Sequence, residues 1–175
     1  MFKHITNESW CTLGPVLYLL FTADIPTPRE KHEMIATFAD DTVLLSSNKD
    51  IKIAVANLQH LLNSTLNWFQ NWGIQINSDK TIQVFYTNKK NTDHQRLLIN
   101  NAPIHTDTKA KYLGMIIDSK LLWKDHILQK KNELNNKFRQ LYWLLGRESK
   151  LTTKNKLLIY NSIISPIWKY GVELC

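Results

Sequence analysis

Two adjacent carboxylates, Asp40 and Asp41, stand between two short apolar runs, residues 34–36 and 42–45. The composition of these runs is typical of β-strands. Strands interrupted only by Asp-Asp predict a tight hairpin over residues 34–46, with both acids at or beside its turn. Adjacent like charges repel, and ionising both is costly unless a cation neutralises them. The pair therefore predicts a site for Mg²⁺ or Mn²⁺, and an ordinary solvated Asp-Asp turn is the alternative.

The size and composition indicate a globular chain. Its 175 residues are 43% hydrophobic and 21% charged, which is enough for one average domain or two small subdomains. The apolar stretch Val16 to Phe21 is far too short to span a bilayer, so we expect no membrane and an intracellular location, in the cytoplasm or nucleus. Cys11 and Cys175 have no zinc-site spacing. We expect the histidines to be surface or incidental residues: His4, His32, His60, His94, His105 and His126.

The positive charge is concentrated in the last third of the chain. Of the net charge of +7, residues 1–108 contribute −1 and residues 109–175 contribute +8. A basic part behind a neutral part with an acidic pair suggests that one part holds a polyanion and the other acts on it. A solvated, lysine-rich helical face is the alternative.

Hydrophobic periodicity predicts strands and helices first, and helices alone after about residue 119. The predicted elements of the first part are a short buried helix from Leu13 that ends before Pro26, the hairpin, a helix over 50–72, strands at 74–76 and 81–86, a second hairpin over 97–105 and a strand over 110–117. The long helix has Asn48 or Asp50 as its N-cap and Gly73 as its stop. Further helices are expected from about 123 to 145, after Thr152 or Thr153, and at Pro166. This order predicts an α+β fold, with helices on one face of an antiparallel sheet and an all-helical part behind it.

Several segments, taken in order, resemble one family. Phe38-Ala39-Asp40-Asp41 resembles an F/Y-A-D-D box, and residues 72–81, WGIQINSDKT, are similar to W-G-x-x-x-N-x-x-K-T. Residues 111–118, KYLGMIID, followed by Trp123 and His126, are similar to a K-Y-L-G-x-x-x-D, W, H segment, and the helices up to residue 174 add to the likeness. The family is the reverse transcriptases of non-LTR (jockey-like, LINE-type) retrotransposons. The chain resembles its C-terminal part, the late palm and the thumb.

The resemblance implies a palm-type antiparallel sheet and a helical thumb. In it, Asp40 ligates Mg²⁺ or Mn²⁺ directly, Asp41 supports the site, and Lys80 protonates the departing pyrophosphate. Leu113 and Gly114 form a Leu-Gly turn that serves as the primer grip. On residues alone, Lys80 is equally a surface turn lysine, and Gly114 a bulge. The implied partners are an RNA template, a DNA primer and deoxynucleoside triphosphates. Basic residues that would contact the duplex are Lys124, Lys130, Lys131, Lys137, Arg139, Lys150, Lys154 and Lys156.

The expected division is a partial palm over 1–87, a hairpin and primer-grip region over 88–118, and a thumb over 119–175. In the family a third metal-binding carboxylate comes from an upstream strand, and no Asp precedes Asp24 here. We therefore expect a truncated polymerase that is inactive alone and depends on upstream polymerase or endonuclease segments. The alternatives are a non-catalytic nucleic-acid-binding module and a degenerate transposon relic.

Overall fold

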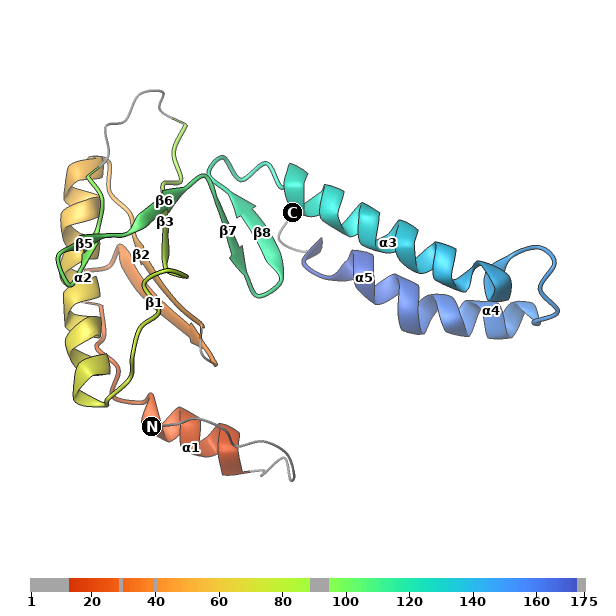
Figure 1. The fold of residues 1–175 in the computed structure, drawn as a ribbon, viewed down its shortest axis with the longest axis horizontal. Helices are drawn as coiled ribbons and strands as arrows, with labels where there is room; N and C mark the ends of the chain where they lie inside the picture. The colour runs from red at the N-terminus through yellow and green to blue at the C-terminus, as the bar shows by residue number, and fades with distance from the viewer. Residues whose placement is uncertain (1–12, 29, 40, 89–94, 173–175) are drawn as a thin grey trace. The chain divides into compact units, whose positions relative to one another are not determined.

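The computed structural model describes residues 13–28, 30–39, 41–88 and 95–172. It contains helices and short strands, compatible with the α+β expectation (Figure 1). The chain divides into two compact units: residues 1–81 with 92–105, called here the first unit, and residues 82–91 with 106–175, the second unit. Within the described residues no helix has the length and apolarity needed to cross a membrane.

The Asp-Asp hairpin forms as predicted. Strands β1 (Glu33–Phe38) and β2 (Asp41–Ser46) are antiparallel, with Phe38 opposite Asp41, so two residues join them. The first residue of this connection, Ala39, has a left-handed backbone with a φ of +50°, and Asp40 lies outside the described residues. Positive φ at the first turn position is what the common two-residue hairpin turns require, because their twist matches that of the strands.

The helix predicted over residues 50–72 is α2 (Ile51–Asn71). Asp50 is the N-cap, and its carboxylate accepts a hydrogen bond from the backbone N–H of Lys52 at 2.9 Å. Gly73, at a φ of +66°, ends the helix as predicted. In the first unit, β2 packs against α2 (Figure 1). The buried side chains of α2 form most of the core that the described residues show. The buried apolar residues of this unit are Val55, Leu61, Leu62, Leu66, Trp68, Leu97, Ile99 and Ile104.

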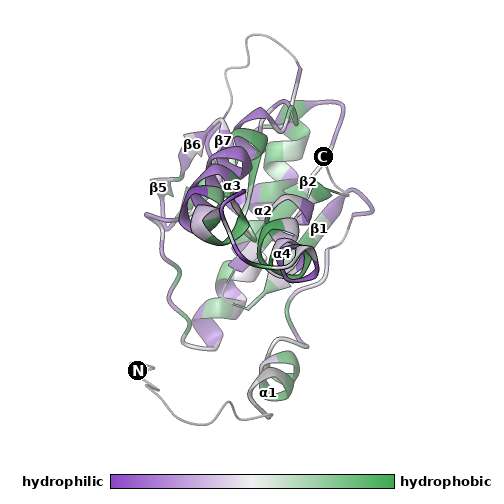
Figure 2. Cartoon of the chain, turned by 90° about the vertical axis from the view of Figure 1, so that its right-hand side faces the viewer, coloured by the Kyte–Doolittle hydropathy of each residue, from purple (hydrophilic) through white to green (hydrophobic). Residues whose placement is uncertain are grey.

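The first helix, α1 (Leu13–Phe21), forms where predicted but is not buried. Its apolar side chains colour most of it as hydrophobic in Figure 2, and Val16, Leu17, Leu19 and Leu20 are exposed. Ring contacts join only its last residue, Phe21, to Trp68 and Trp72 among the described side chains. The prediction of a buried helix was wrong because these contacts cover one end of α1 and leave its length in solvent.

The strands after α2 depart from the expected single sheet. In the described residues the strands pair two by two, as β1 with β2, β3 with β6, β4 with β5 and β7 with β8. The later strands are β3 (Ile82–Val84), β4 (Leu98–Ile99), β5 (Ala102–Pro103), β6 (His105–Asp107), β7 (Lys109–Tyr112) and β8 (Met115–Asp118). The strand expected at 74–76 does not form, because the N–H of Ile74 is bonded back to the carbonyl of Phe69 at the end of α2. The hairpin expected over 97–105 is confirmed as β4 and β5.

The strand expected over residues 110–117 is a hairpin. β7 and β8 are antiparallel, with Tyr112 opposite Met115, and Leu113 and Gly114 form a two-residue turn. Both turn residues have positive φ, +47° and +75°, so Gly114 is a turn residue and not a bulge. The strand pattern missed this turn, which the family resemblance implied, because leucine is rarely the residue placed at a positive φ.

The second unit ends in two antiparallel rows of helix (Figure 1). One is α3 (Lys124–Leu145), ended by Gly146, and the other consists of α4 (Thr153–Ile159), the π-helix η1 (Tyr160–Ile164) and α5 (Ser165–Lys169). Both η1 and α5 pack against α3, and we call these helices together the helical arm. Thr152 caps α4 and Pro166 lies in the first turn of α5, as predicted. The π-helix was not foreseen. It directly precedes Pro166, whose missing N–H interrupts the regular ladder.

Candidate catalytic hairpin and primer-grip turn

The tip of the Asp-Asp hairpin presents a carboxylate to solvent. Asp41, the first residue of β2, is exposed opposite Phe38, which is itself 60% exposed. The hydroxyl of Tyr18, on α1, donates a hydrogen bond to the carbonyl of Ala39 in the turn. Exposed carboxylate oxygen is the kind of ligand that Mg²⁺ and Mn²⁺ prefer. No group of three possible metal ligands occurs among the described residues, a set that leaves out Asp40.

Asp24, in the first unit, is occupied by a structural contact. Its carboxylate accepts a hydrogen bond at 3.1 Å from the indole Nε1 of Trp68, a buried residue of α2. This bond satisfies the indole donor, which would otherwise be costly to bury.

Lys80 lies at the end of an ordered turn in the first unit. The side-chain oxygen of Asn77 accepts a hydrogen bond from the backbone N–H of Lys80 at 3.1 Å, and the carbonyl of Asn77 accepts from Thr81. The turn is therefore built by the asparagine of the W-G-x-x-x-N-x-x-K-T segment. It leaves the side chain of Lys80 exposed.

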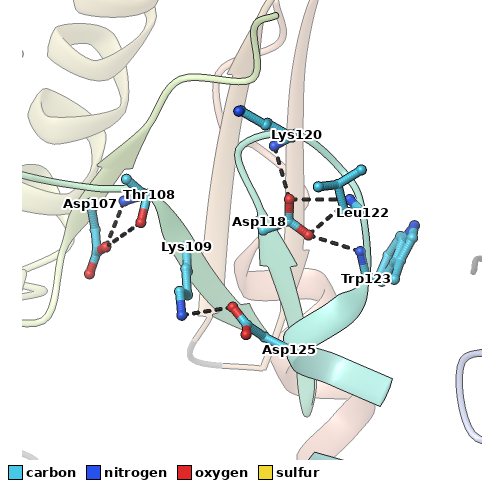
Figure 3. A network of polar contacts seen from close by, with 8 residues as sticks. All are labelled: Asp107, Thr108, Lys109, Asp118, Lys120, Leu122, Trp123 and Asp125. Carbon is cyan, nitrogen blue, oxygen red and sulfur yellow. Dashed lines mark hydrogen bonds and ion pairs between the residues drawn. The ribbon is translucent and has the colours of Figure 1, made fainter. Parts of the chain in front are cut away.

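The loop between β8 and α3 is built around Asp118. Figure 3 shows its carboxylate at the end of β8, facing the backbone of the loop that follows. It accepts hydrogen bonds from the N–H groups of Lys120, Leu122 and Trp123, at distances from 2.9 to 3.1 Å. These bonds, that of Leu122 foremost, hold the pKa of the Asp118 carboxyl below its ordinary value, because they favour the charged form. They also stabilise the left-handed backbone of Leu121 and Trp123.

Two further titratable groups near this loop, Lys109 and Tyr86, have raised pKa values. Lys109, on β7, forms an ion pair of 2.7 Å with Asp125 in the first turn of α3 (Figure 3). The hydrogen bond to Asp125 raises the pKa of the Lys109 ammonium. Burial raises the pKa of the Tyr86 phenol, and the negative charge of Asp118 raises it further.

His126 is buried, so the expectation of a surface histidine was wrong at this position. It is 2% exposed, and its Nδ1 accepts a hydrogen bond from the backbone N–H of Ile116 at 3.4 Å. The imidazole lies between β8 and α3, which pack against each other. Trp123 and His126 also make an edge-to-face ring contact. The K-Y-L-G-x-x-x-D, W, H spacing therefore corresponds to a packed junction between hairpin and helix.

The basic residues predicted to bind a duplex fall into two groups. Lys130 and Lys156 are half-buried and have partners within the helical arm. The Nζ atom of Lys130 lies 3.2 Å from Oε2 of Glu133 and over the ring of Tyr170. The Nζ atom of Lys156 donates a hydrogen bond of 2.9 Å to the carbonyl oxygen of Gly146. The second group is exposed and consists of Lys124, Lys131, Lys137, Arg139, Lys150 and Lys154.

The comparisons with known proteins agree with these motifs. Residues 11–117 match the family described as reverse transcriptase (RNA-dependent DNA polymerase). The chain belongs to the reverse transcriptase family. It is 36% identical over 165 residues to a probable RNA-directed DNA polymerase from transposon X-element of Drosophila melanogaster. It is 33% identical over 168 residues to the RNA-directed DNA polymerase from mobile element jockey of the same species. Both elements are non-LTR retrotransposons.

These alignments cover 93% of this chain but only 18% of each of the two polymerases. The reverse transcriptase chain thus spans about a fifth of the length of the curated relatives that it matches. No solved structure matches it.

Three residues organise this region. Asp118 and His126 belong to a segment of the family resemblance that assigned them no role, and Tyr170 was not singled out from the sequence. An aspartate that directly follows a strand and precedes a helix is a common loop-capping residue, so Asp118 carried a local signal. Tyr170 carried none, because its partner is 57 residues away in the sequence.

Proposed function

We propose that this chain is the part of a non-LTR retrotransposon RNA-directed DNA polymerase that contains the Asp-Asp hairpin, the primer grip and the thumb. The observation that carries the proposal is the hairpin, whose two-residue connection puts Asp41 exposed at its tip in a reverse transcriptase chain. In this proposal the first unit belongs to the palm and the helical arm to the thumb. The three-part division at residues 87 and 118 stays a prediction.

Asp40 and Asp41 are the residues that we propose hold Mg²⁺ or Mn²⁺. The donor set fits such hard cations, since carboxylate oxygens are their preferred ligands. In two-metal polymerisation the ions activate the primer hydroxyl and neutralise the triphosphate. Two adjacent carboxylates supply only part of the ligand set, so we expect a further carboxylate to be needed and the 175 residues to be inactive alone.

The other predicted residues are assigned to binding and proton transfer. Lys80 is proposed to donate a proton and positive charge to the departing pyrophosphate, and its exposure on an ordered turn is compatible with that role. Leu113 and Gly114 are proposed to meet the end of the primer, where the missing side chain of glycine permits close approach of a phosphate. The exposed basic residues of the helical arm are proposed to bind the backbone of the duplex.

The substrates in this proposal are an RNA template, a DNA primer and deoxynucleoside triphosphates. The place of action is inside the cell, in the cytoplasm or nucleus, where such templates occur.

A primer-extension assay on an RNA template tests the proposal. The purified chain is supplied with Mg²⁺ or Mn²⁺, beside Asp40→Ala, Asp41→Ala and Asp79→Ala, the last being an exposed carboxylate outside the hairpin. We expect no extension by the chain itself, and binding to the template-primer that weakens as salt rises. Extension that is abolished by Asp40→Ala but kept in Asp79→Ala would support the assigned metal ligands. It would contradict the expectation that the chain is inactive alone. A folded chain that binds no duplex would contradict the whole proposal.

A non-catalytic binding module is the second candidate, favoured by the six residues that are exposed among the basic residues predicted to bind a duplex. Replacing Lys131 and Lys137 by alanine together should weaken duplex binding and reduce its salt dependence by about one unit of slope per lost phosphate contact. The control is Lys49→Ala, an exposed lysine of the first unit. A binding module requires no metal, so duplex binding unchanged by Asp40→Ala and Asp41→Ala, with no extension under any condition, would favour it.

A further inference from the structure

The primer-grip turn has a backbone that requires support from outside the hairpin. Leu113 adopts a φ of +47°, which is sterically costly for a side chain of this size. Such a conformation persists when surrounding contacts hold it in place. The structure supplies such a contact from the C-terminal end of α5.

Tyr170, the residue that ends α5, reaches the turn with its hydroxyl. It donates a hydrogen bond to the carbonyl of Leu113, and its ring covers Gly114. A Cβ added to Gly114 would lie 3.6 Å from Cε1 of this ring. The tyrosine therefore contacts both residues of the turn, one by a hydrogen bond and one by van der Waals packing.

The position of Tyr170 is itself fixed by neighbours from β8 and α3. The ammonium of Lys130 lies 5.1 Å from the centre of its ring, at a distance that allows a cation–π interaction. The next residue, Gly171, has a φ of +77°, and a Cβ there would come within 3.2 Å of Sδ of Met115 and 3.6 Å of Nε2 of His126. The chain around Tyr170 thus packs closely against β8 and buried His126, which limits where its hydroxyl can move.

The hairpin of the first unit contains the same arrangement. Ala39, also a non-glycine residue at the first turn position, has a φ of +50°, and its carbonyl accepts a hydrogen bond from the hydroxyl of Tyr18 on α1. Each of the two hairpin turns to which the sequence assigns chemistry therefore accepts a hydrogen bond from a tyrosine, which lies on α1 in one case and at the end of α5 in the other. The two cases arise in separate units with different surroundings.

We propose that Tyr170 is a positioning residue for the Leu113–Gly114 turn, whose hydroxyl links the turn to the helical arm and sets where the turn meets the end of a primer. The inference rests on the proposed function, because it needs a nucleic acid with a recessed 3′ end as the ligand. Tyr170 touches the turn and acts through it. Loss of the hydroxyl leaves the ring over Gly114 but frees the carbonyl of Leu113.

The test compares binding of the full chain to two nucleic acids by fluorescence anisotropy. One is an RNA template with an annealed DNA primer that leaves a recessed 3′ end, and the other is a blunt RNA–DNA duplex of the same paired length. The variants are Tyr170→Phe and, as a matched control, Tyr142→Phe, whose side chain lies on α3 and is 73% exposed. We expect the wild type and Tyr142→Phe to prefer the recessed end, and Tyr170→Phe to lose about threefold of that preference, the effect of one hydrogen bond.

Hydrogen exchange gives a readout that does not depend on nucleic acid. In Tyr170→Phe the amides of residues 112–116 should exchange faster than in the wild type, while those of α2 are unchanged. A purely structural role would lower affinity for both nucleic acids alike and leave the ratio unaltered.

The outcomes separate the inference from the proposed function. A wild type that prefers the recessed end, with the same preference in Tyr170→Phe, overturns the inference alone. A wild type that binds neither nucleic acid, or binds both equally, overturns the primer-grip assignment and the inference with it. Reduced preference in Tyr170→Phe with faster exchange at the turn supports both.

Discussion

The two units of this reverse transcriptase chain are stabilised in different ways. Among its described residues the first unit buries eight apolar side chains, most of them on α2. In the described part of the second unit the only buried apolar side chain is Ile164. The other buried residues there are polar: Gln83, His126 and Ser165. The contacts that organise the second unit are polar ones: Asp118 to the loop backbone, Tyr170 to Leu113, and Lys156 to Gly146.

This difference suits the parts proposed for the two units. Burial of apolar area is the dominant favourable contribution to folding, so a unit with a core resists local opening. A helical arm with few buried side chains opens more easily, and its shape depends on a small number of directional contacts. Variants in each unit can break or sharpen this comparison.

The largest effect is expected from Leu61→Ala in the first unit. Leu61 is 3% exposed, so its truncation leaves a cavity in the core and should lower the free energy of unfolding by about 2–5 kcal/mol. Urea unfolding measures the loss, and hydrogen exchange shows where it falls. Leu158→Ala is the control, because this leucine of α4 is 67% exposed and should change stability by less than about 0.5 kcal/mol. An equal loss of unfolding free energy in Leu61→Ala and Leu158→Ala would contradict the difference in burial between these two leucines.

A smaller loss is expected from Ile164→Ala in the second unit. Ile164 is 1% exposed, but an arm with few other buried side chains can close around the cavity, so we expect about 2 kcal/mol. Its neighbour Ile163 is 39% exposed and supplies a matched control as Ile163→Ala. Thermal unfolding of both variants, with exchange measured separately in α2 and α3, makes the comparison. Destabilisation of α2 by Ile164→Ala would show that the two units do not unfold independently.

The N-cap of α2 should contribute about 1 kcal/mol. Asp50→Ala removes the carboxylate that accepts from the N–H of Lys52, so the first turn of the helix loses one of its bonds. The midpoint of urea unfolding should fall accordingly. Asp79→Ala removes the same charge from an exposed turn and should have little effect. A similar shift in both variants would point to net charge as the cause.

The smallest expected effect is a loss of stability of the second unit at low pH. The pKa of Asp118 is lowered in the folded chain, so its ionised form favours folding. That stabilisation is complete above the ordinary value of about 3.8 and is lost as the pH falls through the lowered pKa. Amides of residues 120–123 should exchange faster at pH 2 than at pH 5, after correction for intrinsic rates. In Asp118→Asn this difference should largely disappear, and its persistence would assign the acid sensitivity to another group.

Local patterns predicted much of the fold correctly. The 3.6-residue period, Asp50 and Gly73 were enough for α2, and the Asp-Asp interruption was enough for the β1–β2 hairpin. Such signals lie within a few residues of the element that they specify. The local strand pattern did not show the Leu113–Gly114 turn, which only the family resemblance implied. The left-handed backbone of Leu113 depends on support from Tyr170, and no local pattern reveals that contact.

The family motifs assigned roles to Asp41, Lys80, Leu113 and Gly114, which stay predictions, but assigned none to the other motif residues that order the turns around them. Asn77 orders the turn before Lys80, and Asp118 and His126 order the junction after the Leu113–Gly114 turn. Local sequence could have indicated Asn77 and Asp118, because both bond to backbone groups a few residues away. His126 was expected at the surface because its burial depends on packing between β8 and α3.

By itself the sequence determined the family, the main helices, the Asp-Asp hairpin and the concentration of positive charge in the last third. These properties depend on residue identity, on short-range periodicity or on the order of motifs along the chain. Only the tertiary structure decided that α1 is exposed, that Lys130 and Lys156 have partners within the arm, and that Tyr170 bonds to Leu113. Each of these depends on contacts between segments far apart in sequence, and such contacts form only when the chain has folded.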